Sequence, residues 1–111
     1  MRDVSSYFRA LADRKRWLIV RSLARHGELT VTDLGKQLRL SQPLISWHLR
    51  MLRKANIVKT RREGRQVWCS LDRDALETYE RRIDRILGLT TGPEDDMDEQ
   101  AEELEHAGHG T

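Results

Sequence analysis

Residues 41–56 constrain the fold more than any other segment, because they describe a helix whose ends and sides are both defined. Ser41 is a good N-cap, and Pro43 suits the first helical turn, where a missing N–H loses no hydrogen bond. Asn56 suits a left-handed residue just beyond the C-terminal end. We therefore expect a helix over residues 42–55.

The two sides of this helix differ in chemistry. At about 100° per residue, Leu49 and Leu52 lie within roughly 40° of Ile45, so these three residues form one apolar stripe. The opposite side, between roughly 100° and 200°, holds Pro43, Ser46, Trp47, Arg50 and Lys54. Such a helix packs on a core through one side and presents the other side outward.

A β-hairpin is expected directly after this helix. Two runs typical of strands, Ile57–Arg61 and Arg65–Leu71, flank the turn residues Arg62-Glu63-Gly64. In the second run every other residue faces inward, the period of a half-buried strand: Val67, Cys69 and Leu71. Four cations lie in or beside the turn: Lys59, Arg61, Arg62 and Arg65.

The sequence predicts four further helices, three before residue 41 and one after residue 71. The second helix begins after the N-cap Asp13 and ends at Gly27, and the third begins at Thr30 or Val31. The last begins at Asp72 or Asp74 and ends at Gly88. The second helix turns four residues inward: Trp17, Val20, Leu23 and Ala24. The order predicts a mainly α fold with a small β-hairpin, a winged helix-turn-helix.

Charge divides the chain into two parts. All 20 Lys and Arg residues lie in residues 1–91 with 10 of the 18 acidic residues, whereas residues 92–111 hold the other 8 acidic residues and no base. The basic part is drawn to polyanions, and the acidic part is typical of a disordered tail. With one cysteine, no secretory signal and no membrane-length apolar run, we expect a cytoplasmic protein without a membrane partner.

This architecture favours double-stranded DNA as the partner of a domain spanning residues 1–91. In such folds the second helix of the turn lies in the major groove, while flanking groups hold phosphates. Gln42, Ser46 and Arg50 suit base edges. The predicted DNA-binding residues are Gln42, Pro43, Ser46, Trp47, His48, Arg50, Lys54, Arg61, Arg62 and Arg65.

Between about Val4 and Leu87 the chain resembles the ArsR (arsenic-repressor) family of winged-helix bacterial repressors. The resemblance rests on four segments: Phe8-Arg9-Ala10-Leu11-Ala12-Asp13-x-x-Arg16, Gly27-Glu28-Leu29 with Asp33-Leu34, Ser41-Gln42-Pro43-x-x-Ser46-x-His48-Leu49-x-x-Leu52, and Arg62-Glu63-Gly64-Arg65. It implies a homodimer that represses promoters by binding an inverted repeat, and an inducer that loosens this binding. The first and last helices would pair through Val4, Tyr7, Phe8, Leu11, Leu76, Tyr79, Ile83, Ile86 and Leu87.

The metal sites of that family are missing. Family metal sensors often carry Glu-Leu-Cys-Val-Cys-Asp-Leu in the third helix, where this chain reads Glu28-Leu29-Thr30-Val31-Thr32-Asp33-Leu34. Hydroxyls are poor ligands for metals that prefer thiolate or imidazole. The second family site needs His on the last helix, and no His lies between His48 and His106. We therefore expect no standard metal site and no cofactor.

Three alternatives for regulation then stay open: the protein senses nothing itself, it uses an unusual site at the dimer interface or in the tail, or it depends on a separate sensor or corepressor protein. Residues for a metal in the tail are Glu102, Glu105, His106 and His109, although solvated acidic tails often carry such residues without function. Cys69 fits a small buried hydrophobe better than a redox sensor. His48 lies about 60° from the apolar stripe, at the boundary of the two sides. It either forms a hydrogen bond between helices inside the protein or lies close to DNA.

Trp47 and the fold itself leave two alternatives open. Trp47 either packs on the neighbouring helix or contacts a thymine methyl, a sugar edge or the hairpin. Winged helices also serve as protein-interaction modules, in which Trp47 would be a hot spot and the basic face would bind an acidic partner. An enzyme is not favoured, because no nucleophile–base pair, phosphate-binding glycine loop or carboxylate pair is evident.

Overall fold

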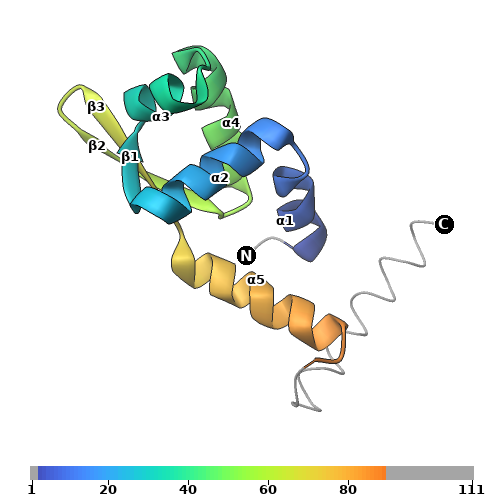
Figure 1. Ribbon diagram of the computed structural model, residues 1–111. Coiled ribbons are helices and arrows are strands. Elements are labelled where there is room, and N and C mark those ends of the chain that lie inside the picture. Colours follow the sequence, from blue (N-terminus) through green and yellow to red (C-terminus); the bar gives the residue numbers. More distant parts are fainter. Residues whose placement is uncertain (1–2, 90–111) are drawn as a thin grey trace. The chain divides into compact units, whose positions relative to one another are not determined.

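The computed structural model describes residues 3–89 (Figure 1). The helices in this part are α1 (Val4–Leu11), α2 (Arg14–His26), α3 (Val31–Leu38), α4 (Gln42–Lys54) and α5 (Arg73–Ile86), and the strands are β1 (Glu28–Thr30), β2 (Val58–Glu63) and β3 (Gln66–Leu71). The chain separates into two compact units, and the division between Leu76 and Glu77 falls inside α5. Among residues 3–89, no helix is both long and apolar enough to cross a membrane.

The predicted helix ends are confirmed, because each depends on a local hydrogen bond or backbone angle. The carboxylate of Asp13 accepts from the amides of Lys15 and Arg16 at 2.8 and 3.1 Å, which starts α2. Gly27 ends α2 with a φ of 83°. Asn56 follows α4 with a φ of 61°, in the left-handed region that Asn tolerates.

The sheet contains one strand more than the sequence predicted. β1 pairs with β3, which pairs with β2, and both pairings are antiparallel. β1 was missed because three residues are too short to show alternation. The hairpin turn is also shorter than predicted: β2 extends to Glu63, which pairs with Gln66, so only Gly64 and Arg65 lie between the strands. Gly64 has a φ of 63°, which favours glycine there.

The core of the first unit lies where α2, α3 and α4 meet the sheet. Ile19, Leu34, Ile45, Leu52 and Ile57 are completely buried in it. On α2 the prediction is right for Leu23, which is completely buried, and for Val20, which packs against the core, but wrong for Trp17, which is 47% exposed, and for Ala24, which is exposed. The completely buried Ile19 was missed. Both choices are apolar at helical spacing, so only the packing distinguishes them. Five helices with a three-stranded antiparallel sheet in this order form a winged helix-turn-helix.

Candidate nucleic-acid interface

The turn between α3 and α4 holds the two helices in a close arrangement. Arg39 adopts the left-handed conformation with a φ of 56°, and the amide of Leu40 donates to the carbonyl of Gly35 at 3.1 Å. A Cβ on Gly35 would lie 3.0 Å from the carbonyl oxygen of Leu40, so a larger residue here would have to push this carbonyl away by a few tenths of an ångström, which favours glycine. The Ser41 hydroxyl then accepts from the amide of Leu44 at 3.3 Å and starts α4.

Helix α4 has the two sides that the sequence predicted. Ile45 and Leu52 are completely buried, and Leu49 is nearly so. The residues exposed on the other side are Gln42, Pro43, Ser46, Trp47, Arg50 and Lys54. The Gln42 amide nitrogen donates to the Thr32 hydroxyl at 3.1 Å, so one end of its side chain is held by α3. This exposed surface of α4 carries donors, acceptors and two cations on one rigid element.

His48 does not belong to that surface. Its side chain is only 5% exposed, because at this point of the turn it faces α2 rather than solvent. A guanidinium nitrogen of Arg16 donates to Nδ1 of His48 at 3.4 Å, while Arg16 Nε donates to the carbonyl of Ala10 at 2.7 Å. Burial lowers the pKa of His48, Asp13 opposes this and Arg16 adds to it. The prediction of a DNA contact at His48 is therefore wrong, and the residue ties α4 to α2.

The β2–β3 hairpin, the wing, projects beyond α2, α3 and α4 (Figure 1). All residues from Arg61 to Gln66 are exposed. The side chains of Arg62 and Arg65 make no hydrogen bond or ion pair within the described part of the chain. Arg53, on the last turn of α4, donates to the Thr60 hydroxyl of β2 at 3.1 Å, which connects the wing to the helix.

Arg61 serves the wing itself. Its guanidinium donates to both carboxylate oxygens of Glu28, at 2.9 and 3.2 Å, and also pairs with Glu63. It lies over the ring of Trp68, 5.5 Å from the centroid. The two carboxylates raise the pKa of Arg61 above its usual value. The prediction that Arg61 binds phosphate is therefore not supported, because its donors already hold β1 and β2 together.

The two threonines that replace the family's thiolates have structural roles. The Thr30 hydroxyl accepts from the amide of Asp33 at 3.0 Å, and the Asp33 carboxylate accepts from the amide of Thr30 at 3.2 Å, which forms a capping box at the start of α3. Thr32 accepts from Gln42. Residues 3–89 contain no group of three His, Cys, Asp or Glu side chains able to hold a metal. The tail residues Glu102, Glu105, His106 and His109 lie outside the described part.

Cys69 is completely buried between β1 and β2, as its place in the strand predicted. Burial raises the pKa of its thiol to about 11, with Arg53 opposing the shift and Glu28 adding to it. We expect Cys69 in the folded protein to react with an aromatic disulfide reagent at least about 100-fold more slowly than Cys69 in the urea-unfolded chain. In the folded protein the thiol stays protonated and the reagent cannot reach it. Equal rates in the two states, measured against free glutathione, would contradict this.

The surface of α4 and the wing define the class of protein. It is a winged helix-turn-helix in which the second helix of the motif, α4, has a polar exposed side and the hairpin is cationic. The family profile described as bacterial regulatory protein, arsR family, matches residues 13–60. The Biofilm growth-associated repressor of Agrobacterium fabrum is 33% identical over 95 residues, which are 86% of this chain and 78% of that protein. The chain belongs to the arsR family of bacterial regulatory proteins, and this places it among regulators rather than enzymes.

Two further comparisons agree with this membership. The Transcriptional repressor SmtB homolog of Synechocystis sp. is 38% identical over 85 residues, 76% of this chain and 64% of that protein. The homodimeric winged helix-turn-helix DNA-binding domain Mb0332 from Mycobacterium bovis superposes with a TM-score of 0.62 at 26% identity, over 69% of this chain and 71% of that one. The chain spans between half and two thirds of the length of several curated relatives that it matches.

Proposed function

We propose that this protein is a transcriptional repressor that binds an inverted-repeat operator as a homodimer. The proposal rests on the exposed surface of α4. This surface carries Arg50 and Ser46, while Ile45 and Leu52 pack the other side of the helix into the core. A rigid helix with polar groups on one side fits the major groove. The named repressors among its relatives support a regulatory role on DNA.

Base recognition is assigned to α4 and phosphate binding to the wing. Gln42, Ser46 and Arg50 reach base edges, with arginine favouring guanine and glutamine favouring adenine. Arg62 and Arg65 bind phosphates, because their guanidinium groups are exposed and unpaired within the described residues. Trp47, which is 50% exposed, lies beside these groups on the outer side of α4 and is assigned to the same interface.

A homodimer supplies the symmetry that an inverted repeat requires. Phe8 of α1 is 54% exposed and Leu87, just after α5, is 64% exposed, as expected of residues covered by a second copy. Val4 and Tyr79 are only 7% and 0% exposed in a single chain, so these two are removed from the predicted dimer surface. The M. bovis domain described as homodimeric supports the assembly. Two copies of α4 would enter successive grooves about 34–36 Å apart.

The experiment compares two arginines after a half-site has been selected from random duplexes. We expect Arg50→Ala to lose about 1–3 kcal/mol of discrimination at one base pair, because it removes a base contact. Arg65→Ala should instead weaken binding to every duplex and reduce the slope of log K against log salt by about 1. Fluorescence anisotropy on selected and scrambled duplexes measures both effects.

Arg14→Ala is the matched control, since Arg14 is an exposed cation on α2 outside both surfaces. If Arg50→Ala and Arg65→Ala lost affinity equally on both duplexes, the division of roles would be wrong. If the selection returned no consensus, the protein-interaction module would replace the repressor, and Trp47→Ala should then weaken the protein partner's binding.

The regulatory signal does not enter through the family's thiolate position, where Thr30 and Thr32 cap and brace the helices. A separate sensor or corepressor protein stays a prediction from the sequence. Purified repressor whose DNA affinity changes on adding a metal or small molecule alone would contradict it.

A further inference from the structure

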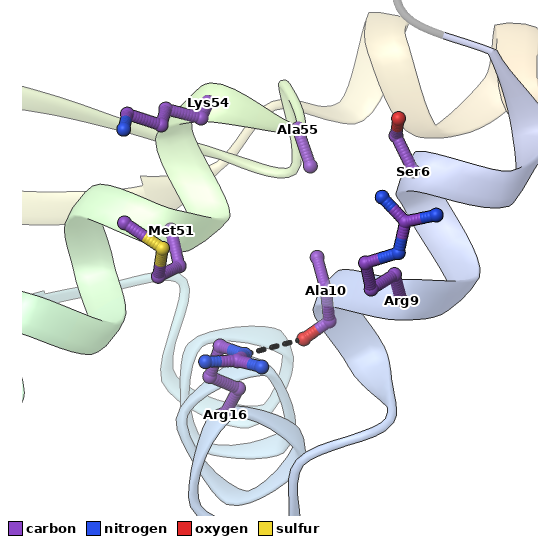
Figure 2. Close-up of a pocket in the computed structure, with 7 residues that line it drawn as sticks. All are labelled: Ser6, Arg9, Ala10, Arg16, Met51, Lys54 and Ala55. Carbon is purple, nitrogen blue, oxygen red and sulfur yellow. Dashed lines mark hydrogen bonds between the residues drawn. The ribbon is translucent and has the colours of Figure 1, made fainter.

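A hollow of about 240 Å³ lies between α1, the start of α2 and the C-terminal end of α4 (Figure 2). Its apolar walls are Ala10, Met51 and Ala55, and the methyl groups of the two alanines point toward each other across it. All of its lining residues belong to the first compact unit. Lys54, an exposed cation of the α4 surface, also lines the hollow, but none of the residues assigned above to base or phosphate contacts does so.

The polar lining of the hollow is cationic. Arg9 extends its guanidinium toward the space from α1, and the Ser6 hydroxyl lies one turn away. Within residues 3–89, the side chain of Arg9 makes no hydrogen bond or ion pair, in contrast to that of Arg61 with its two carboxylates. No carboxylate lines the described hollow. An unneutralised guanidinium beside apolar walls is suited to an organic anion, because one end of the ligand is charged and the other is buried.

The hollow is connected to α4 through Arg16. The guanidinium of Arg16 lines the hollow, donates to the carbonyl of Ala10 and also donates to Nδ1 of His48. His48 lies on α4 roughly 160° around the helix from Arg50, and Met51 lies about 100° from it. An anion that draws Arg16 toward itself competes with His48 for the same donor, so it alters how α4 is held against α2. The guanidinium of Arg16 thus has two alternative partners, His48 and the anion, and this choice couples the hollow to α4.

We propose that this hollow is an effector site for a small organic anion, with a carboxylate or phosphate group on a short apolar body. The anionic group pairs with Arg9 and Arg16, and the apolar body lies between Ala10, Met51 and Ala55. Occupancy weakens DNA binding by releasing His48 from Arg16. This regulatory step rests on the proposed repressor function, and it offers an alternative to a separate sensor protein.

Binding is tested first without DNA. The amide signals of the full ¹⁵N-labelled chain are followed by NMR while n-butyl phosphate or butyrate is added at constant ionic strength. We expect saturable shifts at Ala10, Arg16, Met51 and Ala55 with at least one of the two anions, and the stronger of the two identifies the headgroup. Butanol and inorganic phosphate should give at least about 10-fold weaker effects, because each lacks one half of the ligand. Equal shifts with inorganic phosphate, or none with either organic anion, would overturn the proposal.

Two arginine variants test whether the anion binds in the hollow. Arg9→Gln is expected to weaken the anion's binding at least about 10-fold, since a charge-assisted contact is lost. Arg9 is exposed and unpaired within the described residues, so the variant should keep the spectrum of the folded protein. Arg14→Gln removes an exposed arginine outside the hollow and should bind the anion as the unmodified chain does. Equal loss in both variants would show general charge attraction and overturn the assignment.

Coupling to DNA is tested with the selected duplex. The saturating organic anion should weaken operator binding about 10-fold in the unmodified chain, and by linkage the operator should weaken the anion's binding equally. Arg9→Gln should bind the duplex normally and no longer respond. Normal duplex binding without a response to the bound anion would overturn the effector role. If the anion bound but no duplex did, the repressor function would fail while the site remained.

Discussion

Phe8→Asp is expected to give a folded monomer that binds the selected operator at least about 100-fold more weakly than the unmodified protein. Phe8 is 54% exposed on α1, where its ring meets that of Tyr7 edge-on at 5.5 Å between centroids. A carboxylate at this position would be buried without a partner in a dimer. A dimer engages two half-sites at once, and losing the second engagement removes the gain from effective concentration, about 10²–10⁴.

Sedimentation equilibrium and anisotropy measure the two effects on the same preparation. Trp17→Asp is the matched control, because Trp17 is a similarly exposed aromatic residue on α2 outside the predicted dimer surface. That variant should stay dimeric and keep its operator affinity. A Phe8→Asp protein that remained dimeric would show that the two chains pair through other residues.

Leu52→Ala is expected to lower the free energy of unfolding by about 2–5 kcal/mol, since it opens a cavity under α4. Leu52 is completely buried, and its carbonyl also accepts from the amide of Ile57 at 2.9 Å, where the chain leaves the helix for the hairpin. Trp47→Ala, on the exposed side of the same helix, should change stability by less than about 0.5 kcal/mol. Urea unfolding followed by circular dichroism measures both.

The Trp47 variant also decides between the two interpretations of that residue. A loss of operator affinity with unchanged stability would assign Trp47 to the DNA surface. A loss of stability comparable to that of Leu52→Ala would show that Trp47 packs on the protein, and the proposed interface would have to exclude it.

Local chemistry explains why the helix ends were predictable. Asp13, Thr30, Ser41 and Asn56 each act within three residues of themselves, through a cap or a left-handed backbone angle. The two sides of α4 were predictable for the same reason, because the helical repeat alone places Ile45 and Leu52 together. These features need no knowledge of the rest of the chain.

Long-range contacts explain what the sequence did not show. Arg61 was assigned to phosphate because its partner Glu28 lies 33 residues away, although Glu63, on the same face of β2, offered a nearer partner. His48 was placed at the boundary of a surface because its partner Arg16 lies 32 residues away. Gly35 was overlooked, since its close approach to Leu40 depends on the bend of the turn. The DNA-contacting roles on α4 stay predictions.

The capping box at Thr30 makes metal binding hard to gain at the two positions where the resemblance places thiolate ligands. A thiol in place of Thr30 would remove the hydroxyl that holds the amide of Asp33, at a cost of about 1 kcal/mol to the start of α3. Replacing Thr32 as well would free Gln42, the first residue of α4. Thiolate ligands at these two positions would therefore weaken the start of α3 and its hydrogen bond to α4. A chain that keeps both hydroxyls keeps α4 fixed against α3.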